Sequence, residues 1–170
     1  MIHLKRTLQF RVFLSACLLA LAATLAGCPK GPKVVTKRLP GTAKESKLDL
    51  RVHIAAQANG GNPIALDIVL VSDKELMKEL QKMTAIQWFE RRNQIILDHP
   101  KQSEMIVRQW EWAPGQVVAP DRLVVAPEIK AGIIFANYFN PGDHRAIINP
   151  RAKDILIKLE EDKLEVVTKK

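Results

Sequence analysis

The chain has 170 residues but only two cysteines, and their positions exclude a disulfide framework. Cys17 lies inside a run of apolar residues near the N-terminus, and no cysteine follows Cys28. Nothing downstream of Cys28 can therefore pair with it. Small secreted domains that cannot build a sufficient core depend on disulfides. A folded domain in this chain must instead be stabilised by its apolar core alone.

Signatures of catalysis and of nucleic-acid binding are also missing. The histidines after Cys28, which are His53, His99 and His144, have no partners at the spacing of a zinc site. No nucleophile elbow, phosphate-binding glycine loop or kinase motif set is present. The net charge is +8, yet no basic stripe with interleaved aromatic residues is found. The sequence favours a protein that is not an enzyme, needs no metal or cofactor and binds no nucleic acid.

A few polar and aromatic residues still stand out as candidates for a site. His53 occupies an outward strand position and is expected to be a surface residue. Asp67 lies in an apolar strand, where a hydrogen-bonded structural carboxylate is favoured over a functional acid, since the sequence names no partner for it. Trp110 and Trp112 share one face of a strand, where they could pack against the helices, and packing in the core is favoured over a ligand cage.

The N-terminus has the pattern of a signal peptide. Lys5, Arg6 and Arg11 appear without an acidic residue and precede the apolar segment 12–26. About 15 apolar residues suit the hydrophobic region of a signal peptide, whereas a membrane-spanning helix needs ~20. Residues 1–27 are therefore predicted to be a signal peptide.

The segment Leu25-Ala26-Gly27-Cys28 resembles the lipobox of bacterial lipoproteins. This resemblance implies cleavage before Cys28, which would then carry a covalent diacylglycerol and an N-acyl lipid. Residue 29 is Pro rather than Asp, which by the same resemblance implies the periplasmic face of the outer membrane. The alternative is a plain secretory signal followed by an ordinary free cysteine.

Residues 28–46 are predicted to be a flexible basic tether. They carry several prolines and glycines and show no apolar period. The basic residues of the segment, set against a single acid, Glu45, are Lys30, Lys33, Lys37, Arg38 and Lys44. A solvated tether is favoured over attraction to anionic lipid head groups or to an acidic partner.

Residues 47–170 are predicted to form one mainly β domain, an antiparallel β-sandwich with a helical insertion between strands. Residues 48–57 alternate between apolar and polar, which is typical of a half-buried strand. The turn 58–63 follows, and then the apolar segment 64–71, which suggests a central strand. The further strands are expected at 105–112, 122–126, 129–139, 145–149, 154–159 and 163–167.

The helical insertion is predicted at residues 73–98. Ser72 with Glu75 has the spacing of a capping box, and Thr84 with Gln87 has the spacing of a second one. The residue before a proline avoids the helical region, so Pro100 is expected to end the second helix.

The order of these features resembles the TssJ family, the outer-membrane lipoproteins of the type VI secretion system's membrane complex. The resemblance covers the lipobox and most of residues 48–167, including the strand that leads into "AAQANGGNP" and the step at Trp112, Pro114 and Gly115. It implies a transthyretin-like β-sandwich that acts as a scaffold by binding the periplasmic domain of a TssM-like inner-membrane protein. The family's contact loop joins the first two strands, and on this chain it consists of Ala58, Asn59, Gly60, Gly61, Asn62 and Pro63.

Other functions remain open at this point. The contact loop is short and the helical insertion is longer than the family pattern suggests, so a pilotin-like or other envelope-assembly adaptor lipoprotein is the main alternative. A module that binds a small ligand or cell wall is a third class, which a deep pocket lined by aromatic residues would favour.

Overall fold

A computed structural model describes residues 44–169. The predicted signal peptide, Cys28 and most of the predicted tether lie outside these residues. In chain order the elements are β1 (Ser46–Ile54), a 3-10 turn (Ala58–Gly61), β2 (Ile64–Val71), α1 (Lys74–Leu80), α2 (Ala85–Asp98), β3 (Met105–Trp112), β4 (Asp121–Val125), β5 (Ala131–Ala136), β6 (Arg145–Ile148), β7 (Asp154–Leu159) and β8 (Leu164–Lys169).

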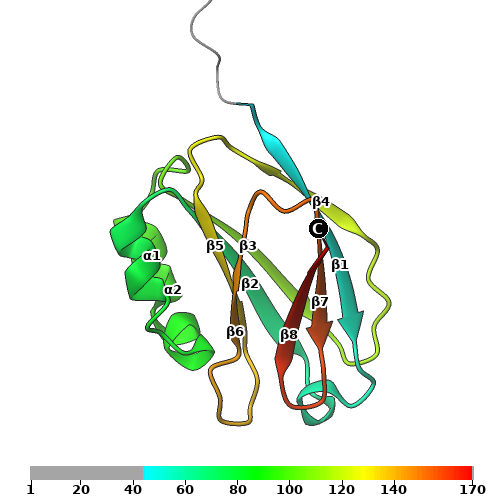
Figure 1. Ribbon diagram of the computed structural model, residues 1–170. Coiled ribbons are helices and arrows are strands. Elements are labelled where there is room, and N and C mark those ends of the chain that lie inside the picture. The colour runs from blue at the N-terminus through cyan, green and yellow to red at the C-terminus, as the bar shows by residue number, and fades with distance from the viewer. Residues whose placement is uncertain (1–43, 170) are drawn as a thin grey trace, which may run out of the picture. The chain divides into compact units, whose positions relative to one another are not determined.

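The eight strands form two facing sheets with the helices on the outside of one of them (Figure 1). One sheet has the strand order β4-β1-β7-β8 and the other the order β3-β2-β5-β6. The predicted mainly β sandwich with a helical insertion is confirmed. One pairing departs from the antiparallel expectation, because β1 and β7 run parallel. β7 follows β6, which belongs to the other sheet. β1 and β7 are therefore not joined by a hairpin and need not run antiparallel.

The predicted strands are found, with small changes at their ends. The predictions for 105–112 and 154–159 coincide with β3 and β7. The strand expected at 129–139 is shorter, since β5 covers only Ala131–Ala136. The amide of Asn137 still donates to the carbonyl of Ala65, but Tyr138 and Phe139 already belong to a loop.

β2 is buried on both faces, as predicted for a central strand. Ile64, Leu66, Ile68 and Leu70 belong to the core between the two sheets. Val69 and Val71 belong to a second core, which lies between this sheet and the helices. Because successive side chains of a strand point to opposite faces, one strand contributes to both cores.

The N-terminus of α1 corrects the first predicted cap. Asp73, and not Ser72, is the N-cap residue, and its carboxylate accepts a hydrogen bond of 2.7 Å from the amide of Leu76. The Ser72 hydroxyl donates instead to the carbonyl of Glu104. A charged carboxylate one residue later is the stronger acceptor at a helix N-terminus.

The prediction for α2 is confirmed at both ends. The amide of Gln87 donates to the Thr84 hydroxyl, and the Gln87 side chain accepts from the amide of Thr84, so both bonds of the capping box are present. The helix ends at Asp98, two residues before Pro100.

Trp110 and Trp112 pack against the core, as favoured, but on the side of the opposite sheet rather than against the helices. They lie opposite Leu66 and Ile64 in the β2–β3 register, so they share the face that looks into the sandwich. The tryptophan that packs between the helices and the sheet is Trp88 of α2, whose ring stacks on Phe135 with centroids 5.1 Å apart. The face of a strand is set by its pairing partner, which the pattern of a single strand does not give.

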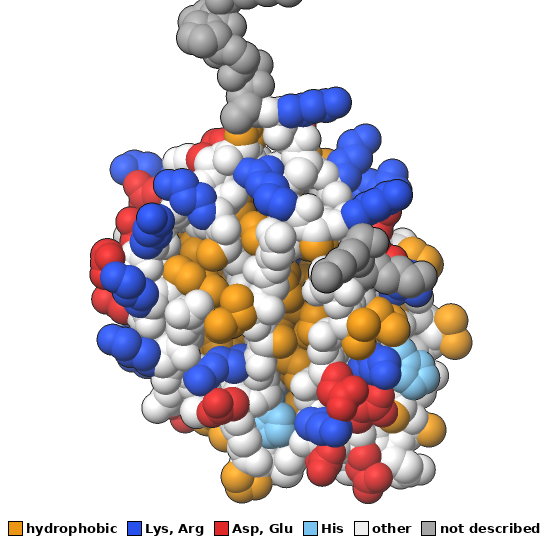
Figure 2. Space-filling model, viewed as in Figure 1, with side chains coloured by type: hydrophobic (Ala, Val, Ile, Leu, Met, Phe, Trp, Pro, Cys, Tyr) orange, Lys and Arg blue, Asp and Glu red, His pale blue; other side chains and the backbone are white. Residues whose placement is uncertain are grey.

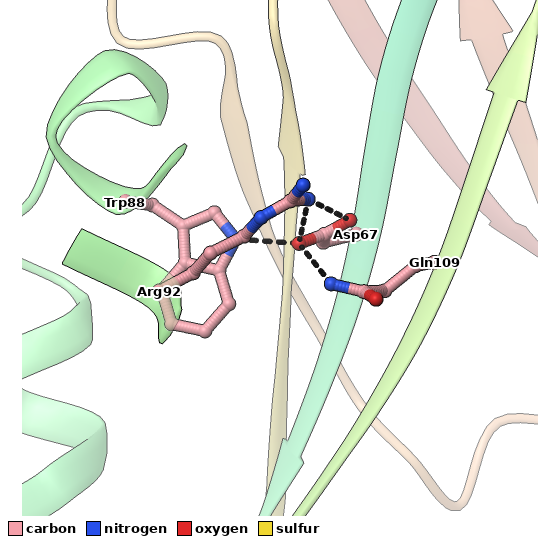
Figure 3. A network of polar contacts seen from close by, with 4 residues as sticks. All are labelled: Asp67, Trp88, Arg92 and Gln109. Carbon is pink, nitrogen blue, oxygen red and sulfur yellow. Dashed lines mark hydrogen bonds and ion pairs between the residues drawn. The ribbon is translucent and has the colours of Figure 1, made fainter. Parts of the chain in front are cut away.

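Asp67 connects the helices to the sheet (Figure 3). Its side chain is fully buried on the helix-facing side of β2. It accepts hydrogen bonds from the indole nitrogen of Trp88 at 2.9 Å, from Arg92 at 3.1 and 3.2 Å, and from Gln109 at 3.4 Å. The preference for a hydrogen-bonded structural carboxylate agrees with this arrangement, and the partners that the sequence could not name come from α2 and β3.

We expect Arg92→Met to lower the free energy of unfolding by about 3 kcal/mol, because it leaves the Asp67 carboxylate buried without a cation. The value lies at the lower end of the usual range since the Arg92 side chain is 30% exposed. Arg91→Met, at the neighbouring exposed position, should change it by less than ~0.5 kcal/mol. Urea denaturation of both variants makes the comparison, and equal losses would contradict the assigned role of Asp67.

Candidate functional site

The loop between β1 and β2 has an unusual backbone. Three consecutive residues have positive φ: Asn59 at 53°, Gly60 at 61° and Gly61 at 84°. Glycine adopts this region at no steric cost, and asparagine is among the few other residues that tolerate it. The sequence "NGG" therefore suits the tight 3-10 turn that carries the chain from one sheet to the other.

Asn59 belongs to the fold rather than to the surface of this loop. Its side chain is 4% exposed, and its amide oxygen accepts a 2.7 Å hydrogen bond from the backbone amide of Phe139. Its side-chain nitrogen donates to the carbonyl of Pro63, and its backbone amide donates to the carbonyl of Glu161. One residue thus joins three loops.

The predicted contact loop divides into a buried and an exposed part. Ala58 is fully buried, as Asn59 nearly is. The exposed members, which alone could contact a partner, are Gly60, Gly61, Asn62 and Pro63. Asn62 caps the turn from outside, since its side chain donates to the carbonyls of Asn59 and Gly60.

Two further loops lie beside it at the same end of the sandwich (Figure 1). The loop at 137–144 joins β5 to β6, and the loop at 160–163 joins β7 to β8. The Tyr138 hydroxyl lies 2.9 and 3.0 Å from the carbonyls of Lys163 and Glu160, and the Asn140 side chain donates to the carbonyl of Asp162. We call these three connected loops, 58–63, 137–144 and 160–163, the loop end.

The loop end presents an aromatic side chain that the sequence analysis missed. Phe139 is 75% exposed although its backbone is fixed by Asn59. Aromatic side chains are enriched at protein interfaces, and a fixed backbone reduces the entropy lost on binding. The sequence feature that indicates this exposed side chain is an aromatic residue directly before the turn "NPGD", where an apolar strand pattern has just ended.

The loop end is also acidic. Glu160, Glu161 and Asp162 are consecutive, and within residues 44–169 none of them forms an ion pair. The neighbouring Lys163 pairs with Glu165 at 2.8 Å. Figure 2 shows acidic side chains gathered at the lower end of the molecule, over the turn between β7 and β8. Together with Phe139, this charge suits a partner surface that combines basic and apolar groups.

None of the histidines in residues 44–169 belongs to a group that could hold a metal ion. His53 is exposed, as predicted. His144 is 8% exposed, where its ring stacks on Tyr138 and one ring nitrogen lies 2.9 Å from the carbonyl of Asn140. Across residues 44–169 there is no group of three or more His, Cys, Asp or Glu side chains placed to hold a metal ion. The helices within the same range are too short or too polar to cross a membrane.

Comparison with known proteins identifies the fold. No protein-family model and no curated protein matches the sequence. Among solved structures, the chain is similar to the type VI secretion lipoprotein TssJ1 from Pseudomonas aeruginosa, with 11% identity, a TM-score of 0.58, and coverage of 75% of this chain and 98% of that one. The Serratia marcescens protein Lip, a membrane bound component of the Type VI Secretion System, matches with 16% identity, a TM-score of 0.58, and coverage of 75% and 99%.

A third match is a chain of a type VI membrane complex, with 15% identity, a TM-score of 0.53, and coverage of 73% of this chain and 98% of that one. These chains are covered almost completely, so the likeness extends to the whole sandwich rather than to one sheet. The chain has a TssJ-like fold.

Tyr138 makes the loop end sensitive to alkaline pH. Burial of this residue, the only tyrosine of the chain, raises the pKa of its phenol above the ordinary value, and the charges of Glu160 and Asp162 raise it further. The unfolded chain therefore ionises first, near pH ~10. The stabilisation is complete below that pH and is lost as the pH rises towards the higher pKa of the folded state.

We expect the free energy of unfolding to fall above about pH 10. Tyr138→Phe should remove the part of this decrease that is due to Tyr138. At neutral pH it should lower the free energy of unfolding by ~1 kcal/mol, because the hydrogen bond of the hydroxyl is lost. Urea denaturation across this pH range, with tyrosinate absorbance to follow the titration, measures both effects. An unchanged alkaline fall in the variant would show that Tyr138 is not its cause.

Proposed function

We propose that this protein is a structural, non-enzymatic lipoprotein of a type VI secretion membrane complex. In this proposal it is attached to the outer membrane by lipid on Cys28, and its loop end binds the periplasmic domain of a TssM-like inner-membrane protein. The observation that carries the proposal is the TssJ-like fold, since the similar structures include a TssJ lipoprotein and a membrane bound component of this secretion system. Their names describe one as a lipoprotein and the other as a membrane bound component of this secretion system.

The geometry of β1 supports this orientation. The described chain enters β1 at Ser46, and the loop end begins just after Ile54. A strand of this length spans about 26 Å. The start of β1 and the loop end therefore lie at opposite ends of the sandwich (Figure 1). Attachment through the N-terminal side leaves the loop end free to face away from the membrane.

The design of the loop end also supports a binding role. Its three loops are fixed to one another through Asn59 and Tyr138, while Phe139 and Asn62 remain accessible. A surface that is already ordered loses little conformational entropy when a partner binds. Its net negative charge favours a partner domain with a complementary basic surface and speeds their encounter.

The lipid anchor predicts that Cys28→Ser abolishes palmitate labelling in cells and releases the protein from the membrane fraction. Several acyl chains on one residue bind a bilayer far more strongly than the remaining polypeptide can, because each buried methylene contributes ~0.8 kcal/mol. Cys17→Ser is the matched control and should leave labelling unchanged. Continued membrane attachment of the Cys28→Ser protein would contradict the anchor.

The partner site predicts that Phe139→Ala and Asn62→Arg each weaken binding to the periplasmic domain of the cognate TssM-like protein by at least ~10-fold, about 1.4 kcal/mol. Phe139→Ala removes the exposed aromatic group, and Asn62→Arg adds bulk and positive charge. Leu97→Arg replaces another exposed apolar residue, which lies on α2 away from the loop end, and should not change the affinity. Calorimetry with thermally stable variants measures all three.

The outcomes separate the partner from the site. If the unmodified protein does not bind this domain, the partner is wrong and a different envelope adaptor function has to be sought. If it binds but Phe139→Ala and Asn62→Arg leave the affinity unchanged, the loop end is not the contact surface.

A further inference from the structure

The sandwich contains a hollow between β3 and β4, the edge strands of the two sheets. On the other side of the sandwich, β6 and β8 lie side by side (Figure 1). Between β3 and β4 the sheets border a half-open space of about 310 Å³. Pockets for small molecules in proteins usually measure about 300–1,000 Å³, so this hollow is at the small end of that range.

The hollow ends at the surface of the core. Ile68 and Ile157 line it from the two sheets, and both are fully buried. Trp110 and Trp112 line it from β3, with stacked rings whose centroids are 5.8 Å apart. Protein interiors contain few voids larger than a water molecule. If these apolar side chains were placed only to pack against one another, they would fill this space.

A short strap at residues 113–120 covers the hollow. Its first residues are fixed, because the amide of Gly115 donates to the carbonyl of Ala55 and that of Gln116 to the carbonyl of Ala113. Farther along, Val118 lines the hollow, whereas its neighbour Val117 is 95% exposed. The strap therefore offers two adjacent valines, of which only one faces the hollow.

A polar groove of about 520 Å³ continues from the hollow and shares Trp110 and Asp121 with it. Arg108 and Arg122 line this groove. Arg122 is held by a bidentate ion pair with Asp49, but Arg108 is exposed and has no ion pair within residues 44–169. Arg108 lies opposite Ile68 in the β2–β3 register, on the face that looks towards the hollow.

We propose that the hollow and the groove together form a binding site for a single-chain amphiphile with an anionic head, such as a fatty acid or a lysophospholipid. The apolar chain lies between the tryptophans and the two isoleucines, and the head lies against Arg108. Apart from Asp121, the side chains that line the hollow are apolar. The hydroxyl groups of a sugar bound there would therefore lack hydrogen-bond partners. The small volume admits one chain rather than two. This site is independent of the proposed partner contact at the loop end.

The tryptophans provide the readout. The chain has three tryptophans. Trp88 lies on α2 and is fully buried in the other core, between the helices and the sheet. The probe is 12-bromododecanoate below its micelle concentration, added to the chain from residue 28 with Cys28→Ser so that no covalent lipid competes. Bromine quenches tryptophan emission on contact. We expect saturable quenching of the tryptophan emission. This quenching should be weaker in the Trp110→Phe and Trp112→Phe variants and should persist in the Trp88→Phe variant.

Two matched pairs of variants locate the ligand. Val118→Phe fills the hollow and should weaken binding at least tenfold, whereas Val117→Phe on the same strap should leave it unchanged. Arg108→Gln should weaken the carboxylate probe several-fold without affecting dodecanol, whereas Arg91→Gln on α2 should affect neither. Native mass spectrometry with dodecanoate checks that one chain is bound per protein.

Three results would overturn the proposal. Quenching that does not saturate, or that is equal in Val118→Phe and Val117→Phe, would show that the hollow is not the site. Equal affinity for dodecanoate and dodecyltrimethylammonium would show that Arg108 does not select an anionic head. None of these results bears on binding at the loop end, which is measured with a different partner and different variants.

Discussion

β2 is buried on both faces, and this burial determines what must pack on either side of it. One face contributes to the core between the sheets, so the other face needs a cover, which α1 and α2 provide. Asp67 is the one charged residue in this strand, and a buried carboxylate is tolerated only when it is paired and hydrogen-bonded. Trp88 and Arg92 meet this requirement from α2. The helical insertion is therefore part of the core rather than an appendage, and it leaves the ends of the sandwich free for function.

A few buried polar side chains also hold the loop end together. Asn59 satisfies the backbone groups of three loops from a single buried position, and Tyr138 ties two of them together from the opposite side. Such fixed loops suit a scaffold protein, whose task is to hold a partner rather than to transform a substrate. The hollow beside Trp110 and Trp112 is different in kind, since it opens the apolar interior instead of presenting a surface. The hollow and the loop end are formed by different residues.

Much of the fold could be predicted because it is encoded locally. The alternation of residues 48–54 and the apolar run 64–71 give β1 and β2, and the Thr84–Gln87 capping box gives the start of α2. Long-range pairing could not be predicted. The parallel match of β1 with β7 and the face on which Trp110 and Trp112 lie depend on which strands become neighbours. The candidate loop was located by resemblance, but the buried role of Asn59 and the exposure of Phe139 result from three loops that are far apart in the sequence.

If the loop end holds an inner-membrane partner, site-specific photo-crosslinking in living cells should capture that contact. A photoreactive amino acid is placed at position 62 in one strain and at position 97, on the exposed face of α2, in another. Position 62 should be cross-linked to a TssM-like inner-membrane protein, identified by mass spectrometry, and position 97 should not. Cross-linking of that protein at position 97 alone, or its absence at both positions while the protein is correctly lipidated, would show that the loop end does not hold this partner.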